Sequence, residues 1–398
     1  MLFLTYWFVL YIAVLFPVYW LVASRDMRRV VLLIGSVVFH THFAGPAGVL
    51  PIAVLGLLTY WVGVSGSKWA CRAMVLGNVL ALVYYKYALF LSAKVLGAVW
   101  PAAEAFGTTS PLLKEIVPPL AISFFVFEYV HYLLDVARGE APLRDPVDFA
   151  LFSVFWPSIV AGPVKRYQDF IPNLERGLTQ VGTADVGEGA LRIAVGYAKK
   201  IVADNLTAYI TFATPRYDQM ELEWRWVLVL CIGVRILLDF SGYTDMAVGF
   251  ARMHGIKLPE NFNWPYLTRS IVSFWRCWHM SLSLWIRDYI YIALGGNRRG
   301  VIRTAVNGLL TFALCGLWHG AGFNFLVWGV LHGAALAVAT NYRRLWYPGR
   351  ALGWAFDRVP PLGWAATMLF VFLAWLFFFY PVPQAAHMIL FLLPEKWR

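Results

Sequence analysis

The sequence has 398 residues, of which 60% are hydrophobic, 17% aromatic and 14% charged, and its formal net charge is +11 at pH 7. Soluble domains carry roughly 25% charged residues, so this composition excludes an ordinary soluble protein and indicates one that crosses a membrane several times. In a soluble protein the positive charge would suggest nucleic acid. Here the basic residues stand in short loops between apolar runs, which indicates contact with anionic membrane lipids and no nucleic-acid partner.

Apolar runs of about the 20 residues needed to span a bilayer follow one another along the chain. Candidate spans stand at 2–22, 30–45, 48–64, 73–97, 116–136, 190–213, 225–250, 302–318, 321–340 and 362–380, and a shorter run stands at 384–394. The first run lacks a basic segment and a cleavage site, so we interpret it as a retained span and not a signal peptide. We predict an all-α polytopic protein of about 11 spans, forming one membrane-embedded domain over residues 1–398.

Two segments depart from the pattern of simple spans. The apolar run at 150–163 is interrupted by Trp156-Pro157 and Gly162-Pro163. Proline lacks the N–H that a helix needs, so this run is predicted to re-enter the membrane and not to cross it. Residues 259–296 mix aromatic side chains with Arg, Asp and His, and they predict tilted or interfacial helices that line a polar cavity.

The loops rich in Lys and Arg all fall on one side if the spans alternate and 150–163 re-enters. These loops stand at 25–29, 68–72, 138–144, 165–166, 252–257, 298–303, 343–350 and 396–398. By the positive-inside rule that side is the cytoplasm, so the N-terminus is predicted outside and the C-terminus in the cytoplasm.

Two histidines stand in apolar runs, and each follows a tryptophan: Trp278-His279 and Trp318-His319. An imidazole at membrane depth is usually paired, functional or both. Burial disfavours its charged form, so such a histidine stays neutral and can accept a proton as a general base. The glycines at 320 and 322 are expected to interrupt a helix directly after His319. The alternative, a satisfied interfacial histidine, remains open.

Further polar residues surround these histidines in the sequence. Arg276 stands three positions before His279, so in a helix the two would share a face and Arg276 could hold an anionic group. Asp239, Ser241 and Asp245 lie inside an apolar run and would either orient a catalytic histidine or form a helix–helix network. Lys165 and Arg166 would bind either the phosphates of a cytosolic coenzyme or anionic headgroups.

Several other site classes find no support in the sequence. There is no GxSxG, no GxxxxGK[ST] and no GxGxxG after a strand, so serine hydrolase, P-loop and dinucleotide sites are not predicted. His319 and His332 have no carboxylate at ligand spacing, so no metal site is predicted. His332 is expected to bond across helices.

Several motifs agree in order with one known family. They stand at 119–125, 135–140 (DVARGE), 161–167 (AGPVKRY), 239–249 (DFSGYTDMAVG), 274–288 (FWRCWHMSLSLWIRD), 295–298 (GGNR) and 317–320 (LWHG). With these motifs the sequence resembles the membrane-bound O-acyltransferases, and most of all the bacterial branch similar to alginate O-acetyltransferases. The resemblance runs from about residue 80 to about residue 340.

The resemblance implies a multi-helix bundle around a through-membrane tunnel, with His319 as the catalytic histidine and His279 as the second functional residue. The tunnel lining that we derive from it comprises Arg276, Trp278, Arg287, Asp288, Trp318 and Asn324, with Lys165, Arg166 and Arg298 as possible contacts of the donor phosphates. Acetyl-CoA or another acyl thioester is the implied donor substrate, and no tightly bound cofactor is expected.

The resemblance also implies an inner-membrane protein that passes the acyl group outward to an SGNH-type partner. The partner would then modify a cell-surface polysaccharide, such as an alginate-like exopolysaccharide, cellulose or peptidoglycan. The lack of a soluble domain fits that division of labour. One departure is the run at 375–380 (WLFFFY), where relatives carry an FFRA-like motif, and it leaves partner docking and acceptor identity open.

Three alternatives remain: an enzyme of the teichoic-acid D-alanylation type, a protein or lipid acyltransferase of the same superfamily, and a transporter or flippase without covalent chemistry. Transporters often show inverted repeats with paired broken segments, and the sequence shows no such symmetry.

Overall fold

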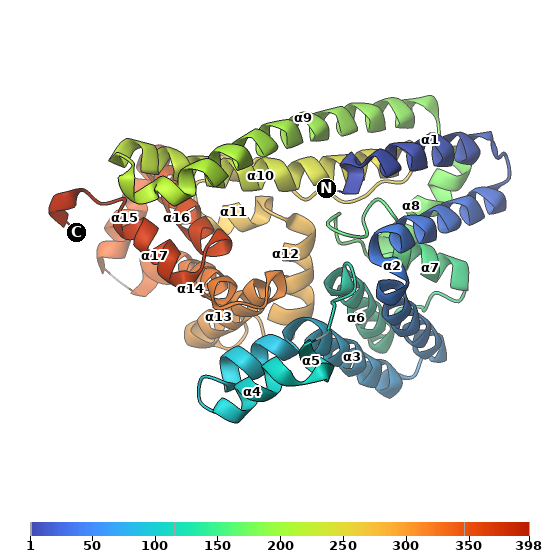
Figure 1. Ribbon diagram of the computed structural model, residues 1–398, viewed down its shortest axis with the longest axis horizontal. Helices are drawn as coiled ribbons and strands as arrows, with labels where there is room; N and C mark the ends of the chain where they lie inside the picture. Colours follow the sequence, from blue (N-terminus) through green and yellow to red (C-terminus); the bar gives the residue numbers. More distant parts are fainter. Residues whose placement is uncertain (1, 115, 346, 398) are drawn as a thin grey trace. The chain divides into compact units, whose positions relative to one another are not determined.

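The computed structural model describes residues 2–114, 116–345 and 347–397 (Figure 1), without the side chains of 112, 114, 343–345, 347 and 348. Within these ranges the chain forms helices and connecting turns and no strand, so the all-α prediction is confirmed. The basic pair Arg343/Arg344 and Arg398, which belong to the predicted topology, lie outside the described side chains.

The chain divides into two compact units. The first consists of Met1–Ile193 and Met246–Pro259, and the second of Ala194–Asp245 and Glu260–Arg398. The first unit contains α1 (Tyr6–Leu21), α2 (Arg25–Ser65), α3 (Lys68–Leu82), α4 (Pro101–Thr109), α5 (Pro111–Lys114), α6 (Ile122–Arg138), α7 (Pro146–Val154), α8 (Tyr167–Gln180), and parts of α9 (Thr183–Ala213) and α10 (Leu222–Met253).

The second unit contains the remaining parts of α9 and α10 and the C-terminal helices. These are α11 (Ile271–Cys277), α12 (Met280–Ile286), α13 (Gly300–His319), α14 (Phe323–Leu345), α15 (Tyr347–Arg358), α16 (Pro360–Phe379) and α17 (Val382–Leu390), with short segments η4 (Thr214–Gln219), η5 (Pro265–Leu267), η6 (Arg287–Tyr291) and η7 (Glu395–Trp397). That the whole chain forms one domain stays a prediction.

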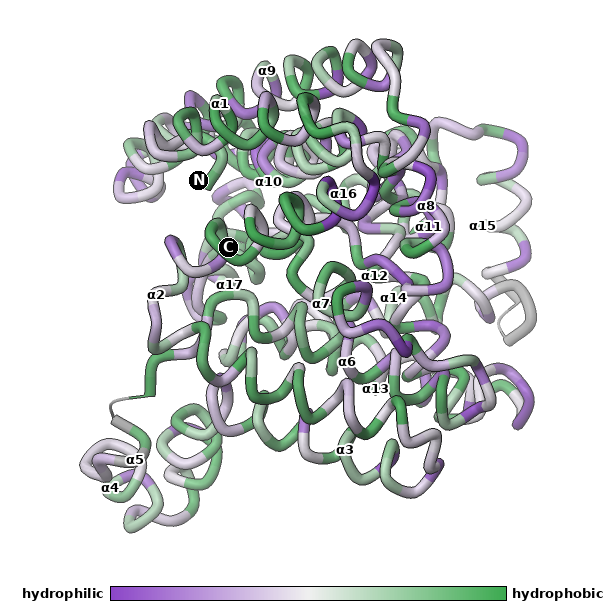
Figure 2. The backbone as a smooth tube through the Cα atoms, turned by 90° about the vertical axis from the view of Figure 1, so that its right-hand side faces the viewer, coloured by the Kyte–Doolittle hydropathy of each residue, from purple (hydrophilic) through white to green (hydrophobic). Residues whose placement is uncertain are grey.

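Five of the described helices are long and apolar enough to cross a membrane: α2, α10, α13, α14 and α16. A sixth candidate is the pair Lys68–Tyr87 and Phe90–Leu96, which is bent by 68°. Figure 2 shows the hydrophobic residues along these helices. The protein is therefore a multi-pass membrane protein, although fewer helices qualify than the number of apolar runs.

The number of helices long and apolar enough to cross a membrane is smaller than the number of apolar runs for local reasons. The runs at 30–45 and 48–64 both belong to α2, where two helical segments meet at Gly45 with φ +67°. Those at 2–22 and 116–136 form helices of 16 and 17 residues, shorter than the about 20 that span a bilayer. The run at 190–213 lies in α9, which carries Lys199, Lys200 and Asp204.

The helix break predicted at 150–163 is present. Helix α7 ends at Val154, and the following residues, including the fully buried Phe155 and Trp156, turn without forming a helix until α8 begins at Tyr167. Residues on either side of the break are in contact: Gln168 Nε2 donates to Asp135 Oδ2 at 2.9 Å and Tyr167 Oη to the Ala141 carbonyl at 3.3 Å. The start of α8 thus contacts the chain that precedes α7, and re-entry of 150–163 into the membrane stays a prediction.

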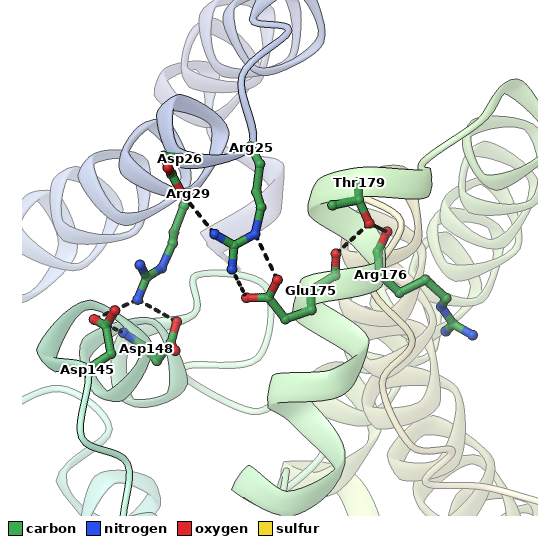
Figure 3. A network of polar contacts seen from close by, with 8 residues as sticks. All are labelled: Arg25, Asp26, Arg29, Asp145, Asp148, Glu175, Arg176 and Thr179. Carbon is green, nitrogen blue, oxygen red and sulfur yellow. Dashed lines mark hydrogen bonds and ion pairs between the residues drawn. The ribbon is translucent and has the colours of Figure 1, made fainter.

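A network of ion pairs joins helices α2, α7 and α8 (Figure 3). Arg29 Nη2 lies 2.6 Å from both Asp145 Oδ1 and Asp148 Oδ1. Arg25 binds Glu175 with two nitrogens, at 2.9 and 2.6 Å. Bidentate arginine–carboxylate pairs fix geometry as well as supply energy, so the basic start of α2 is held against the start of α7 and against α8.

Candidate active site

His319 is the last residue of α13, and the helix interruption expected after it is present. Gly320 ends the helix in an extended conformation, and α14 begins at Phe323. A Cβ at Gly320 would lie 2.1 Å from Phe325 Cε2, and one at Gly316 would lie 2.1 Å from the Phe325 carbonyl oxygen. The turn after His319 therefore depends on residues without side chains, because α14 packs directly against the backbone of α13.

Aromatic rings surround the His319 imidazole, which is half-buried. The ring centroids of Trp318, Trp328 and Phe378 lie 4.7, 5.2 and 5.0 Å from that of His319, in edge-to-face orientations. Phe378 belongs to the run at 375–380. This run thus contributes directly to the surroundings of His319.

His279 lies between two helices and not within one. It follows the end of α11 and precedes α12, with φ +42° and ψ +54°, a left-handed conformation that is uncommon for residues other than glycine. Only 1% of it is exposed, and neither ring nitrogen has a hydrogen-bond partner among the residues described. Burial lowers the pKa of His279 to about 3, so the imidazole is neutral at physiological pH.

Trp318 connects the two histidines. Its ring centroid lies 4.7 Å from that of His319 and 6.3 Å from that of His279. Phe240 of α10 closes another side of His279 at 4.7 Å, with the rings at 79°. The structure therefore brings His279, His319 and Trp318 together in the second unit. Buried polar groups without partners and strained backbone are both features that cluster at functional sites.

The expectation that Arg276 and His279 share one helix face is wrong. Because α11 ends at Cys277 and His279 adopts the left-handed conformation, the two residues do not share a helix face. Arg276 is exposed, whereas Trp278 and His279 are buried. The spacing argument fails because it assumes one continuous helix.

The other predicted lining residues are less buried than His279. Arg287 is exposed and pairs with the half-buried Asp288 at 2.6 Å. Asn324 is half-buried in the first turn of α14. The role of these three residues in a tunnel stays a prediction.

The three predicted phosphate contacts differ in burial and belong to different units. Lys165 belongs to the first unit, is only 2% exposed and pairs with Glu128 at 2.5 Å, so its charge is already neutralised inside the protein. Arg166, also in the first unit, is half-buried at the start of α8. Arg298 belongs to the second unit and is exposed in the turn before α13.

Asp239 and Asp245 bind lysines of α9. Lys200 Nζ lies 2.8 Å from Asp239 Oδ1, and Lys199 Nζ lies 2.5 Å from Asp245 Oδ2. Ser241 is buried between them in sequence, with 4% exposed. These contacts are those of a helix–helix network, the second of the two interpretations that the sequence left open.

His332 belongs to the same aromatic cluster as His319, which the sequence did not reveal. Trp275 Nε1 donates to His332 Nδ1 at 3.3 Å, and the Trp328 ring lies between His332 at 4.8 Å and His319 at 5.2 Å. Among the described residues no three His, Cys, Asp or Glu side chains form a metal-binding group. The spacing of Phe325, Trp328 and His332 along one face of α14 is the signal that could have found this residue.

Comparison with known proteins defines the family. The sequence model of the membrane-bound O-acyltransferase family matches residues 67–382, so the chain belongs to this family and is an O-acyltransferase. It is 36% identical to the probable alginate O-acetylase of Pseudomonas putida over 93% of this chain and 75% of that protein. It is 37% identical to the probable alginate O-acetylase of Pseudomonas aeruginosa over 93% of this chain and 70% of that protein. It is 31% identical to the peptidoglycan O-acetyltransferase of Helicobacter pylori over 92% of this chain and 71% of that protein.

Proposed function

We propose that the protein transfers an acetyl group from a cytosolic coenzyme A thioester to a polysaccharide on the other side of the inner membrane, with His319 as general base. The observation that carries this proposal is the placement of a half-buried imidazole at the end of α13, directly before the glycine at which the helix is interrupted. A reacting group can approach an imidazole that is only half-buried.

The chemistry follows from a neutral imidazole. His319 accepts the proton of an acceptor hydroxyl as the oxygen attacks the thioester carbonyl. The carbon–sulfur bond then breaks, the coenzyme leaves as a thiolate and takes up the proton, and an ester remains on the acceptor. His279, buried and neutral, is proposed to contact the reacting thioester through an unpaired ring nitrogen.

The acceptor is proposed from the relatives. Two are named alginate O-acetylases and one a peptidoglycan O-acetyltransferase, and both polymers present sugar hydroxyls outside the membrane. An SGNH-type partner would complete the transfer to the polymer. Arg298 is the retained candidate for the donor phosphates because it is exposed, whereas Lys165 is not retained because Glu128 neutralises it.

The test replaces the proposed base in membranes supplied with radiolabelled acetyl-CoA. His319→Gln should reduce transfer to polysaccharide at least about a hundredfold, the lower end of what general-base catalysis contributes. The matched control is His387→Gln, because His387 is exposed on α17 and its Nε2 lies 2.7 Å from Asp218 Oδ1. Near wild-type transfer by a correctly inserted His319→Gln protein would show that His319 is not the base.

A further inference from the structure

The left-handed conformation of His279 has to be maintained by its neighbours. Helices α11 and α12 run in different directions on either side of it (Figure 1). The first N–H groups of α12 have no partner within that helix and need acceptors from elsewhere. His279 itself gives α12 no side-chain cap, so another residue must accept these bonds.

Asn261 supplies those acceptors. Its carbonyl oxygen accepts from Met280 N at 2.9 Å, and its Oδ1 accepts from Ser281 N at 3.3 Å and from Ser281 Oγ at 2.6 Å. The asparagine is fully buried. The Asn261 side chain thus caps α12 as an N-cap residue caps other helices. It does so from a segment that lies 18 positions before His279 in the sequence.

The same segment also holds the end of α11. Asn263 N donates to the Cys277 carbonyl at 3.0 Å. Residues 261 and 263 therefore bind the chain just after and just before the break. The backbone of His279 is fixed from both directions, which explains how a strained conformation persists there.

The segment is connected in turn to α10. Asn261 Nδ2 donates to Thr244 Oγ1 at 3.5 Å, and Phe240, one helical turn before Thr244, places its ring 4.7 Å from the His279 ring. Both residues belong to the motif at 239–249. One face of this part of α10 therefore contacts the imidazole through Phe240 and supports its backbone through Asn261.

We infer that Asn261 is a positioning residue for acyl transfer: by capping α12 it holds the His279 imidazole against Phe240 and Trp318. This inference rests on the proposed function, because it assigns Asn261 to the reaction only through His279. Asn261 acts through a helix cap and does not itself contact the substrate.

The test compares Asn261→Ala with Asn263→Ala in the purified full-length protein with acetyl-CoA. Asn261→Ala removes the side-chain cap, so kcat should fall at least about tenfold while the KM for acetyl-CoA stays within about twofold. Asn263→Ala keeps its main-chain bond to Cys277, and its exposed side chain predicts kcat and KM like those of the wild type. Unchanged kcat in Asn261→Ala, or equal losses in both variants, would overturn the inference.

One further variant keeps the test decisive if Asn261→Ala does not fold, and a double variant extends the test where Asn261→Ala does fold. Ser281→Ala removes the hydroxyl bond to Asn261 Oδ1 and should lower kcat about threefold without changing KM; an unchanged kcat would contradict the inference. In a folded double variant, Asn261→Ala and Ser281→Ala should lose no more activity than Asn261→Ala alone, because both act on one contact. Additive losses would count against it. A wild-type protein without acetyl transfer would instead refute the proposed function.

Discussion

At the scale of single residues, His279 adopts a backbone conformation that glycine takes freely and alanine does not. We therefore expect His279→Gly to be more stable than His279→Ala by about 1 kcal/mol, since both variants lack the imidazole and differ in the cost of a positive φ. Thermal unfolding in detergent measures the difference.

The control for this comparison is Leu284, which is exposed within α12. There Leu284→Ala should be the more stable of the pair Leu284→Ala and Leu284→Gly, because glycine lowers helix stability. If the alanine variant were more stable than the glycine variant at both position 279 and position 284, the left-handed conformation of His279 would not be present in solution.

Because Lys165 and Glu128 form a buried ion pair, we expect a conservative substitution of Glu128 to lower the stability of the protein strongly. Glu128→Gln keeps the shape of the side chain but leaves Lys165 buried without its counter-charge, so stability should fall by about 3–5 kcal/mol. Asp288→Asn at the more exposed pair with Arg287 should cost less than about 1 kcal/mol. Chemical unfolding of the two variants measures both values, and equal effects would contradict the burial of Lys165.

At the scale of helices, the two segments of α2 meet at Gly45, which is followed by Pro46. Gly45 has φ +67°, and no atom lies within 4 Å of a Cβ built on it. Gly45→Ala should therefore lower the free energy of unfolding by about 1 kcal/mol through backbone strain alone.

Gly308 of α13 is the matched control, because a Cβ there also meets open space but φ is not positive. Gly308→Ala should be neutral or stabilising by up to about 1 kcal/mol, as in other helix interiors. If Gly45→Ala and Gly308→Ala changed the free energy of unfolding equally, α2 would have to continue through Gly45 as a regular helix.

At the scale of the whole molecule, the membrane topology can be tested by labelling single cysteines in a protein whose four native cysteines are replaced. Ala141→Cys is expected to react from the cytoplasm, and Thr108→Cys and Gln219→Cys from outside, with a reagent that does not cross the membrane. The reason is the excess of Lys and Arg in the loops on one side. All three positions are exposed.

Re-entry at 150–163 has its own pair of labels. Arg138→Cys and Asp169→Cys should react from the same side, because Asp135 and Gln168 are hydrogen-bonded across the two ends of the segment. Labelling of the two from opposite sides would make 150–163 a true span and would invert the orientation predicted for every later loop.

The sequence by itself determined the fold class, the family and the helix break after His319. Each of these rests on local properties: long apolar runs report burial in a bilayer, ordered motifs report the family, and glycines report where a helix is interrupted. The end of α13 at His319 was predictable because Gly320 is its next residue in the chain.

The tertiary structure alone decided how the site is arranged. That His279 is left-handed, that Arg276 does not share its face, and that Lys165 is neutralised by Glu128 depend on residues distant in the sequence. Asn261 caps α12 from another segment, and Trp328 brings His332 toward His319. Such contacts leave no periodic signal in the chain, because they arise only when separate helices pack and satisfy each other's polar groups.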